Sequence, residues 1–157
     1  MRREIVQSVS RAVFIVLCLW GGLSSALTVP SNSAFNLSNY AGKVVYVDFW
    51  ASWCRPCLES FPFMADMSRQ FGDELAIVAI NVDEDKNDAL RFLEIFQAPF
   101  EIVYDPRGEL ASGFDIPGMP TSYLFDREGN LLMRHVAFKR SHIDSLQQAI
   151  KKAVESP

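Results

Sequence analysis

Two cysteines separated by two residues, Cys54 and Cys57, are the side chains of this chain best suited to chemistry. They follow an apolar, strand-like run at residues 44–50 and lie where a helix should begin. A C-x-x-C pair at such a junction is typical of a redox-active dithiol. A disulfide across a four-residue loop contributes only about 2 kcal/mol of loop entropy, against roughly 3 kcal/mol for a fifteen-residue loop. The spacing therefore favours an exchangeable pair over a structural crosslink.

The two thiols are expected to have different roles. Cys54 is the expected nucleophile, because N–H groups at a helix N-terminus favour a thiolate. Cys57, about one turn deeper, would resolve a mixed disulfide. Arg55 either stabilises the Cys54 thiolate or is a solvated side chain, and both interpretations stay open. A zinc site would need two more ligands, and His135 and His142 lack the spacing of a second ligand pair, so we expect neither a metal nor a cofactor.

One carboxyl, Asp48, interrupts the apolar run before the cysteines. A carboxyl inside a buried strand is costly unless it is used or hydrogen-bonded. We expect Asp48 to have a raised pKa and to exchange a proton with Cys57 during the reaction. The alternative is a structural carboxyl in a satisfied hydrogen-bond network.

The first 26 residues have the pattern of a secretory signal peptide. A basic start is followed by an apolar run and by small residues, with Ser24-x-Ala26 as the expected cleavage site. The apolar stretch from Ala12 to Leu27 has 16 residues, which is short for a spanning helix. An uncleaved membrane anchor is the alternative. Either interpretation predicts a periplasmic or other extracytoplasmic location.

Residues 27–157 are expected to form one domain. Without the leader they carry 12 basic and 18 acidic residues, a net charge of −6, which argues against nucleic-acid binding. Cys18 leaves with the leader, so the remaining cysteines are the C-x-x-C pair alone.

Hydrophobic periodicity predicts a β-α-β-α-β-α-β-β-α order, which is typical of one α/β domain with a mixed sheet. Strands are expected at 44–49, 75–80, 100–104, 122–125 and 131–136, and helices at 54–71, 87–96, 109–114 and from 141 onward. Ser141-x-x-Asp144 resembles a capping box for the last helix. The acidic group Asp83-Glu84-Asp85-Asp88, with Lys86 and Arg91, is expected to be a solvated helix start.

Several motifs together resemble the thioredoxin fold. They are Val47-Asp48-Phe49-Trp50-Ala51-Ser52-Trp53-Cys54, Cys57, Pro62 and Met119-Pro120-Thr121. The strand and helix between Leu75 and Phe96, with Asp105-Pro106-x-Gly108 and Phe125-Asp126-x-x-Gly129, resemble the TlpA/ResA-like branch. The likeness covers about residues 35–152. It implies a thioredoxin-like domain with a central mixed β-sheet flanked by helices and a TlpA-type strand-helix insertion.

This resemblance also implies a function. Members are exported thiol:disulfide oxidoreductases that act on cysteines of other exported proteins, and several reduce apocytochrome c or copper-site cysteines. We therefore expect a reductant that has protein substrates and a membrane-embedded thiol electron donor. The alternatives are a protein thiol oxidase or isomerase, a copper metallochaperone and, less favoured, a peroxidase.

The resemblance further implies a cis Pro120 packed against the thiols, with the Met119 backbone offered to an extended substrate and with Trp53 and Trp50 covering the site. The sequence departs from the branch at two positions. Ser60 stands where many members have a glutamate, and Glu59, one place earlier, should point elsewhere. Asp48 stands where the branch often has asparagine. These departures weaken an assignment to cytochrome c maturation.

Overall fold

The computed structural model describes residues 29–156. The signal peptide and anchor hypotheses for residues 1–26, and Cys18, lie outside them. The strands are β1 (Val44–Trp50), β2 (Leu75–Asn81), β3 (Glu101–Tyr104), β4 (Thr121–Phe125) and β5 (Leu131–Val136). The helices are α1 (Cys57–Phe71), α2 (Lys86–Ile95), α3 (Glu109–Gly113) and α4 (Ile143–Glu155), with short 3-10 turns η1 (Leu37–Tyr40), η2 (Gly72–Glu74) and η3 (Arg140–His142). This is the predicted order of elements.

The five strands form one mixed sheet in the order β3-β2-β1-β4-β5. β1 pairs in parallel with β2 and antiparallel with β4, so it lies at the centre of the sheet. This position explains why the β1 segment is almost entirely apolar, since all seven of its residues are buried. The strand and helix expected between Leu75 and Phe96 are β2 and α2.

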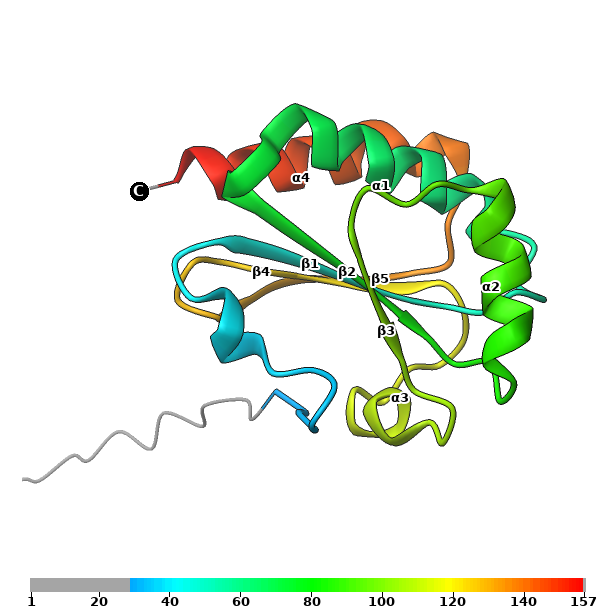
Figure 1. Cartoon of the computed structure of the whole chain (residues 1–157). Helices are drawn as coiled ribbons and strands as arrows, with labels where there is room; N and C mark the ends of the chain where they lie inside the picture. Colours follow the sequence, from blue (N-terminus) through cyan, green and yellow to red (C-terminus); the bar gives the residue numbers. More distant parts are fainter. Residues whose placement is uncertain (1–28, 157) are drawn as a thin grey trace, which may run out of the picture.

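Helices cover both faces of the sheet, with α1 and α4 together on one side and η1 and α3 on the other (Figure 1). Side chains of β1 alternate between two buried clusters. Tyr46 and Trp50 belong to the cluster under α1, α2 and α4, while Val47 and Phe49 belong to the cluster under η1 and α3. By this alternation Asp48 faces the side covered by α1.

Two predicted helix starts are wrong. Helix α1 begins at Cys57 rather than at Cys54, with Pro56 as its N-cap. Residues 51–54 form a turn in which Cys54 N donates to Ala51 O at 3.1 Å. Helix α4 is preceded by η3, which contains Ser141, and its N-cap His142 makes no side-chain capping bond, so the expected capping box is absent.

No helix within residues 29–156 combines the length and the apolar character that a membrane crossing requires.

Candidate active site

The two cysteines are joined in a disulfide at the junction between β1 and α1, with their Cα atoms 5.4 Å apart. Cys57 N donates to Cys54 O at 3.0 Å, which closes the turn that leads into the helix. Cys57 is fully buried, whereas Cys54 keeps a small exposed area. Of the two residues, Cys54 is therefore the one with surface that an external thiolate can reach.

The tryptophans beside the cysteines differ in their environment. Trp53 is 67% exposed and stands next to Cys54 at the surface. Trp50 is fully buried and packs on Phe61 and Phe92, with ring centroids 4.8 Å away in both cases. Trp50 is thus a core residue, and of the two only Trp53 is available to a substrate. Arg55 is also exposed, between the cysteines.

Asp48 is 0% exposed, and its Oδ1 accepts a hydrogen bond from Ser122 Oγ at 2.7 Å. Its Oδ2 has no hydrogen-bond partner among the described residues. Burial raises the pKa of Asp48 to about 7, and the bond from Ser122 opposes this effect. The carboxyl can therefore gain or lose a proton near neutral pH. It faces the cluster that contains Cys57, on the same face of β1 as Tyr46.

The Met119–Pro120 peptide bond is cis, as the resemblance implies. Met119 packs against the same large buried cluster to which both cysteines belong. Thr121 Oγ1 donates to Gly118 O at 2.6 Å, and Ala137 N donates to Pro120 O at 2.9 Å. These bonds hold the loop in place at the start of β4.

One residue at the site, Asp83, was not expected there. It is 4% exposed, so its assignment to a solvated acidic helix start is wrong. Its carboxylate accepts from Ser52 N at 2.9 Å, from Ser52 Oγ at 3.0 Å and from Asn81 Nδ2 at 2.7 Å. Because Ser52 lies two residues before Cys54, Asp83 anchors the turn that carries Cys54.

A sequence signal for this contact did exist. Ser52 follows the last residue of β1 by two positions, and Asp83 follows the last residue of β2 by two positions. Since β1 and β2 are parallel neighbours, their carboxyl ends meet at one edge of the sheet. The neighbouring Asp85 does cap a helix, because its side chain accepts from Asn87 N at the start of α2.

Ser60, which stands where many members of the branch have a glutamate, and the preceding Glu59 have different environments. Ser60 is buried, and its hydroxyl donates to Cys57 O at 3.2 Å. Glu59 is partly exposed and pairs with Arg140 at 3.4 Å, away from the disulfide. The expectation that Glu59 points elsewhere is confirmed.

The two histidines, by contrast, come together although their spacing did not predict it. His142 Nδ1 lies 3.1 Å from His135 Nε2, across the connection between β5 and η3. Burial, followed by the neighbouring His142, lowers the pKa of His135. Within residues 29–156 no group of three His, Cys, Asp or Glu side chains is arranged to hold a metal ion.

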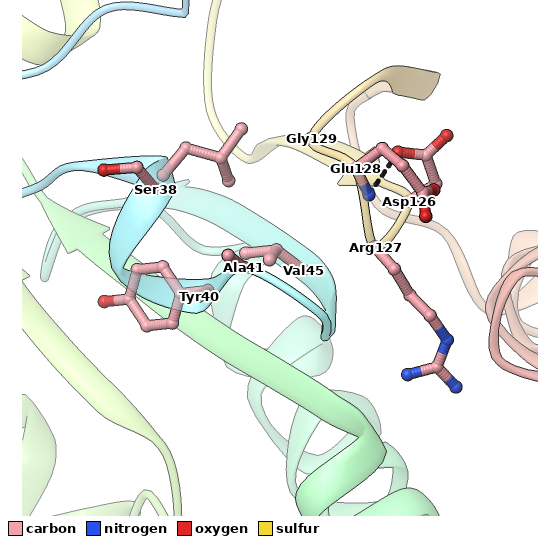
Figure 2. Close-up of a pocket in the computed structure, with 9 residues that line it drawn as sticks. Ser38, Tyr40, Ala41, Val45, Asp126, Arg127, Glu128 and Gly129 are labelled. Atoms are coloured by element: carbon pink, nitrogen blue, oxygen red, sulfur yellow. Dashed lines mark hydrogen bonds between the residues drawn. The ribbon is translucent and has the colours of Figure 1, made fainter.

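A hollow at the opposite end of β1 offers no comparable chemistry. It is lined by η1 and by the loop between β4 and β5 (Figure 2). Asp126 accepts hydrogen bonds from the backbone of its own loop, at Glu128 N and Asn130 N. Arg127 extends away from the hollow and donates to Gly42 O and Glu74 Oε2. The candidate site therefore remains at the cysteines.

A mixed sheet of this order, a C-x-x-C disulfide at the start of a helix and a cis-proline just before β4 define a thioredoxin-fold protein. The chain belongs to the Redoxin family, which matches residues 23–150.

Its relatives confirm the resemblance to the TlpA/ResA-like branch. The chain is 34% identical over 97 residues to the thiol-disulfide oxidoreductase ResA of Bacillus subtilis, covering 61% of this chain and 54% of ResA. It is 32% identical over 120 residues to the thiol:disulfide interchange protein CycY of Rhizobium leguminosarum, covering 72% of this chain and 63% of CycY. The chain thus spans between about half and two thirds of the length of these curated relatives.

Solved structures agree with this assignment. A thiol:disulfide interchange protein DsbE from Chlorobium tepidum superposes with a TM-score of 0.74 at 42% identity, over 75% of this chain and 84% of that one. The exposed lipoprotein thioredoxin Etrx1 of Streptococcus pneumoniae superposes with a TM-score of 0.64 at 29% identity, over 75% and 90% of the two chains.

Proposed function

We propose that this chain is a thiol:disulfide oxidoreductase that reduces disulfides in other exported proteins. The observation that carries the proposal is the Cys54–Cys57 disulfide at the start of α1, in which Cys54 keeps a small exposed area and Cys57 has none. Relatives that are named thiol-disulfide oxidoreductase or thiol:disulfide interchange protein support an activity in thiol–disulfide exchange.

The reaction runs through a mixed disulfide. In the reduced protein the Cys54 thiolate attacks one sulfur of a substrate disulfide, forms a new S–S bond and releases the other substrate sulfur as a thiolate. Cys57 then attacks the sulfur of Cys54 and releases the second substrate thiolate. The protein gains a disulfide, the substrate loses one, and two electrons pass to the substrate. Asp48 takes the proton of Cys57 as that thiol becomes a nucleophile.

The surface around Cys54 supports binding of an extended substrate segment. Among the described residues no backbone hydrogen bond involves Met119, which lies two residues before Thr121, the first residue of β4 and the end of its pairing with β1. Its backbone can thus pair with a substrate strand, as in strand addition. Trp53, the neighbour of Cys54 in the chain, supplies exposed apolar surface, and Arg55 supplies a positive charge.

The substrate and the location belong to the same proposal. The leader pattern of residues 1–26 supports an extracytoplasmic site of action, with the segment either cleaved or kept as an anchor. The substrates would be exported proteins, with apocytochrome c and copper-site cysteines as the first to test. A membrane-embedded thiol protein would return the electrons, since a soluble dithiol pool is not retained in such a compartment.

The decisive experiment is trapping in cells. A Cys57→Ser variant should accumulate a mixed disulfide through Cys54, visible as an adduct that dithiothreitol releases, whereas the matched Cys54→Ser variant should give none. The potential of the Cys54/Cys57 couple against glutathione tests the direction. A value near −270 mV fits a reductant, and one near −120 mV would make the protein an oxidant. If no adduct forms and the wild-type disulfide does not react with dithiols, the proposed function is wrong.

A further inference from the structure

Among residues 29–156, one side chain donates a hydrogen bond to the buried carboxyl of Asp48. Ser122 on β4 is the residue directly opposite Asp48 in the antiparallel β1–β4 ladder. Side chains of such a pair lie on the same face with Cβ atoms about 5 Å apart. Ser122 is 2% exposed, and its hydroxyl donates to Asp48 Oδ1 at 2.7 Å. On the other flank of β1, Asp48 is paired with Ala79 of β2, which has no polar side-chain atom.

We propose that Ser122 is a positioning residue for the proton transfer that accompanies disulfide exchange, because its hydroxyl holds Asp48 Oδ1 and leaves Oδ2 as the oxygen that gives and takes the proton. The inference rests on the proposed function. It deepens that function by assigning a second residue to the acid–base step.

The hydroxyl has one proton, and the short bond directs it to Oδ1. When Asp48 is neutral, its own proton is therefore on Oδ2, the oxygen without a partner among residues 29–156. When Asp48 is ionised, the hydroxyl stabilises the anion, which opposes the effect of burial on its pKa. Removing the hydroxyl would leave a buried carboxylate with no hydrogen bond from a side chain.

The other ionisable groups on this side of the sheet do not replace Ser122. Tyr46 lies on the same face of β1. Burial, and then the charge of Asp48, raises its pKa far above neutrality, against a smaller lowering by a hydrogen bond with Ser122, so Tyr46 stays neutral. Cys57 at the start of α1 is the thiol that the carboxyl serves. His135 on β5 is opposite Ser122, but its Nε2 lies against His142. The buried residues of α4 are apolar: Leu146, Ile150 and Ala153.

The position of Ser122 also ties this step to substrate binding. Ser122 follows Pro120 by two residues, so β4 carries both the cis-proline loop and the group that holds Asp48. The loop is fixed at its end by the bond from Ala137 N to Pro120 O. The acid–base carboxyl and the substrate loop are therefore held by the same strand.

The test is the titration of Asp48 in the oxidised full chain, followed by infrared difference spectroscopy of the protonated carboxyl. Ser122→Ala should raise the titration midpoint by about one pH unit, a tenfold change in proton affinity. Ser122→Thr and Ser122→Val form a matched pair of nearly equal shape, in which Thr should keep the wild-type midpoint and Val should raise it. If Ser122→Ala does not fold, the comparison of Ser122→Thr with Ser122→Val still tests the effect of the hydroxyl on the titration midpoint.

Activity provides the second measurement. The pH–rate profile for reduction of a test disulfide should move upward in Ser122→Ala by the same amount, and Ser122→Ala should have no effect on the profile in an Asp48→Asn background. The proposal would be overturned if the titration midpoint of Asp48 stayed unchanged in both Ser122→Ala and Ser122→Val. It would also be overturned if Ser122→Ala shifted the pH–rate profile equally in the wild type and in the Asp48→Asn background. Because the infrared titration needs no substrate, its result stands even if the proposed function fails.

Discussion

Replacing Asp48 with Asn should make the protein more stable at neutral and alkaline pH, by an amount that depends on pH. Burial raises the pKa of Asp48 to about 7, from an ordinary value of 3.8. The folded protein therefore binds this proton more tightly than the unfolded chain does. Between about pH 4 and pH 7 the unfolded chain has lost the proton while the folded protein still holds it, so the stability of the wild type falls as the pH rises.

The magnitude follows from the two pKa values. Each tenfold change in proton affinity corresponds to about 1.4 kcal/mol, so the difference between 3.8 and about 7 amounts to about 4 kcal/mol above pH 7. Asn keeps the approximate shape of the carboxyl and cannot ionise. Relative to Asp48→Asn, the wild type should lose about 1.4 kcal/mol of stability for each pH unit in this window.

Urea unfolding of the oxidised proteins at several pH values between 4 and 8 measures the effect. The quantity of interest is the difference in unfolding free energy between the wild type and Asp48→Asn, because other titrations cancel in it. Glu109→Gln is a suitable control. The hydrogen bond from Arg107 lowers the pKa of Glu109, so this pair contributes stability that is lost as the pH falls, with the opposite sign. If the Asp48→Asn difference is the same at pH 4 and pH 8, the account of a buried, proton-exchanging Asp48 is refuted.

Three further perturbations follow from the site. Asp83→Ala should destabilise the protein by about 2–4 kcal/mol in urea unfolding, because it leaves the partly buried Ser52 N–H and the buried Asn81 amide without their acceptor. Ser52→Ala should cost less, since the Asn81 bond to the carboxylate and the backbone bond from residue 52 remain. An equal loss in both variants would contradict this role for the carboxylate. The pKa of His135 is lowered in the folded protein, so protonation of this side chain favours the unfolded chain. The unfolding free energy of the wild type should therefore fall relative to that of His135→Gln as the pH drops below about 6.5, and an equal difference between the two proteins at pH 5 and pH 8 would contradict this. Trp53→Ala should change stability by only about 0.5 kcal/mol and yet slow reduction of a protein disulfide more than that of a small one, and equal rates would remove Trp53 from substrate binding.

Patterns within a few residues were sufficient to predict much of this molecule. The apolar run before the cysteines predicted a strand buried on both faces, and β1 is buried along its whole length. The same run marked Asp48 as an unusual carboxyl, and it is fully buried with a raised pKa. Near-neighbour spacing carries this information because strand and helix periodicity repeats over a few residues.

Local patterns were less reliable at the ends of elements. The predicted helix from Cys54 begins at Cys57 instead, after a turn and Pro56. The predicted capping box at Ser141 is replaced by a 3-10 turn. In both cases several backbone conformations fit the same residues, and packing decides between them.

The sequence by itself determined the candidate groups for the chemistry, which are two thiols two residues apart and a carboxyl in an apolar run, and it also determined the order of strands and helices. Only the tertiary structure decided which side chains support them. Ser122 is 74 residues from Asp48, and Asp83 is 31 residues from Ser52. Both contacts depend on which strands are neighbours and in which register, and pairing between strands so far apart in the chain leaves no periodic signal in the segments themselves.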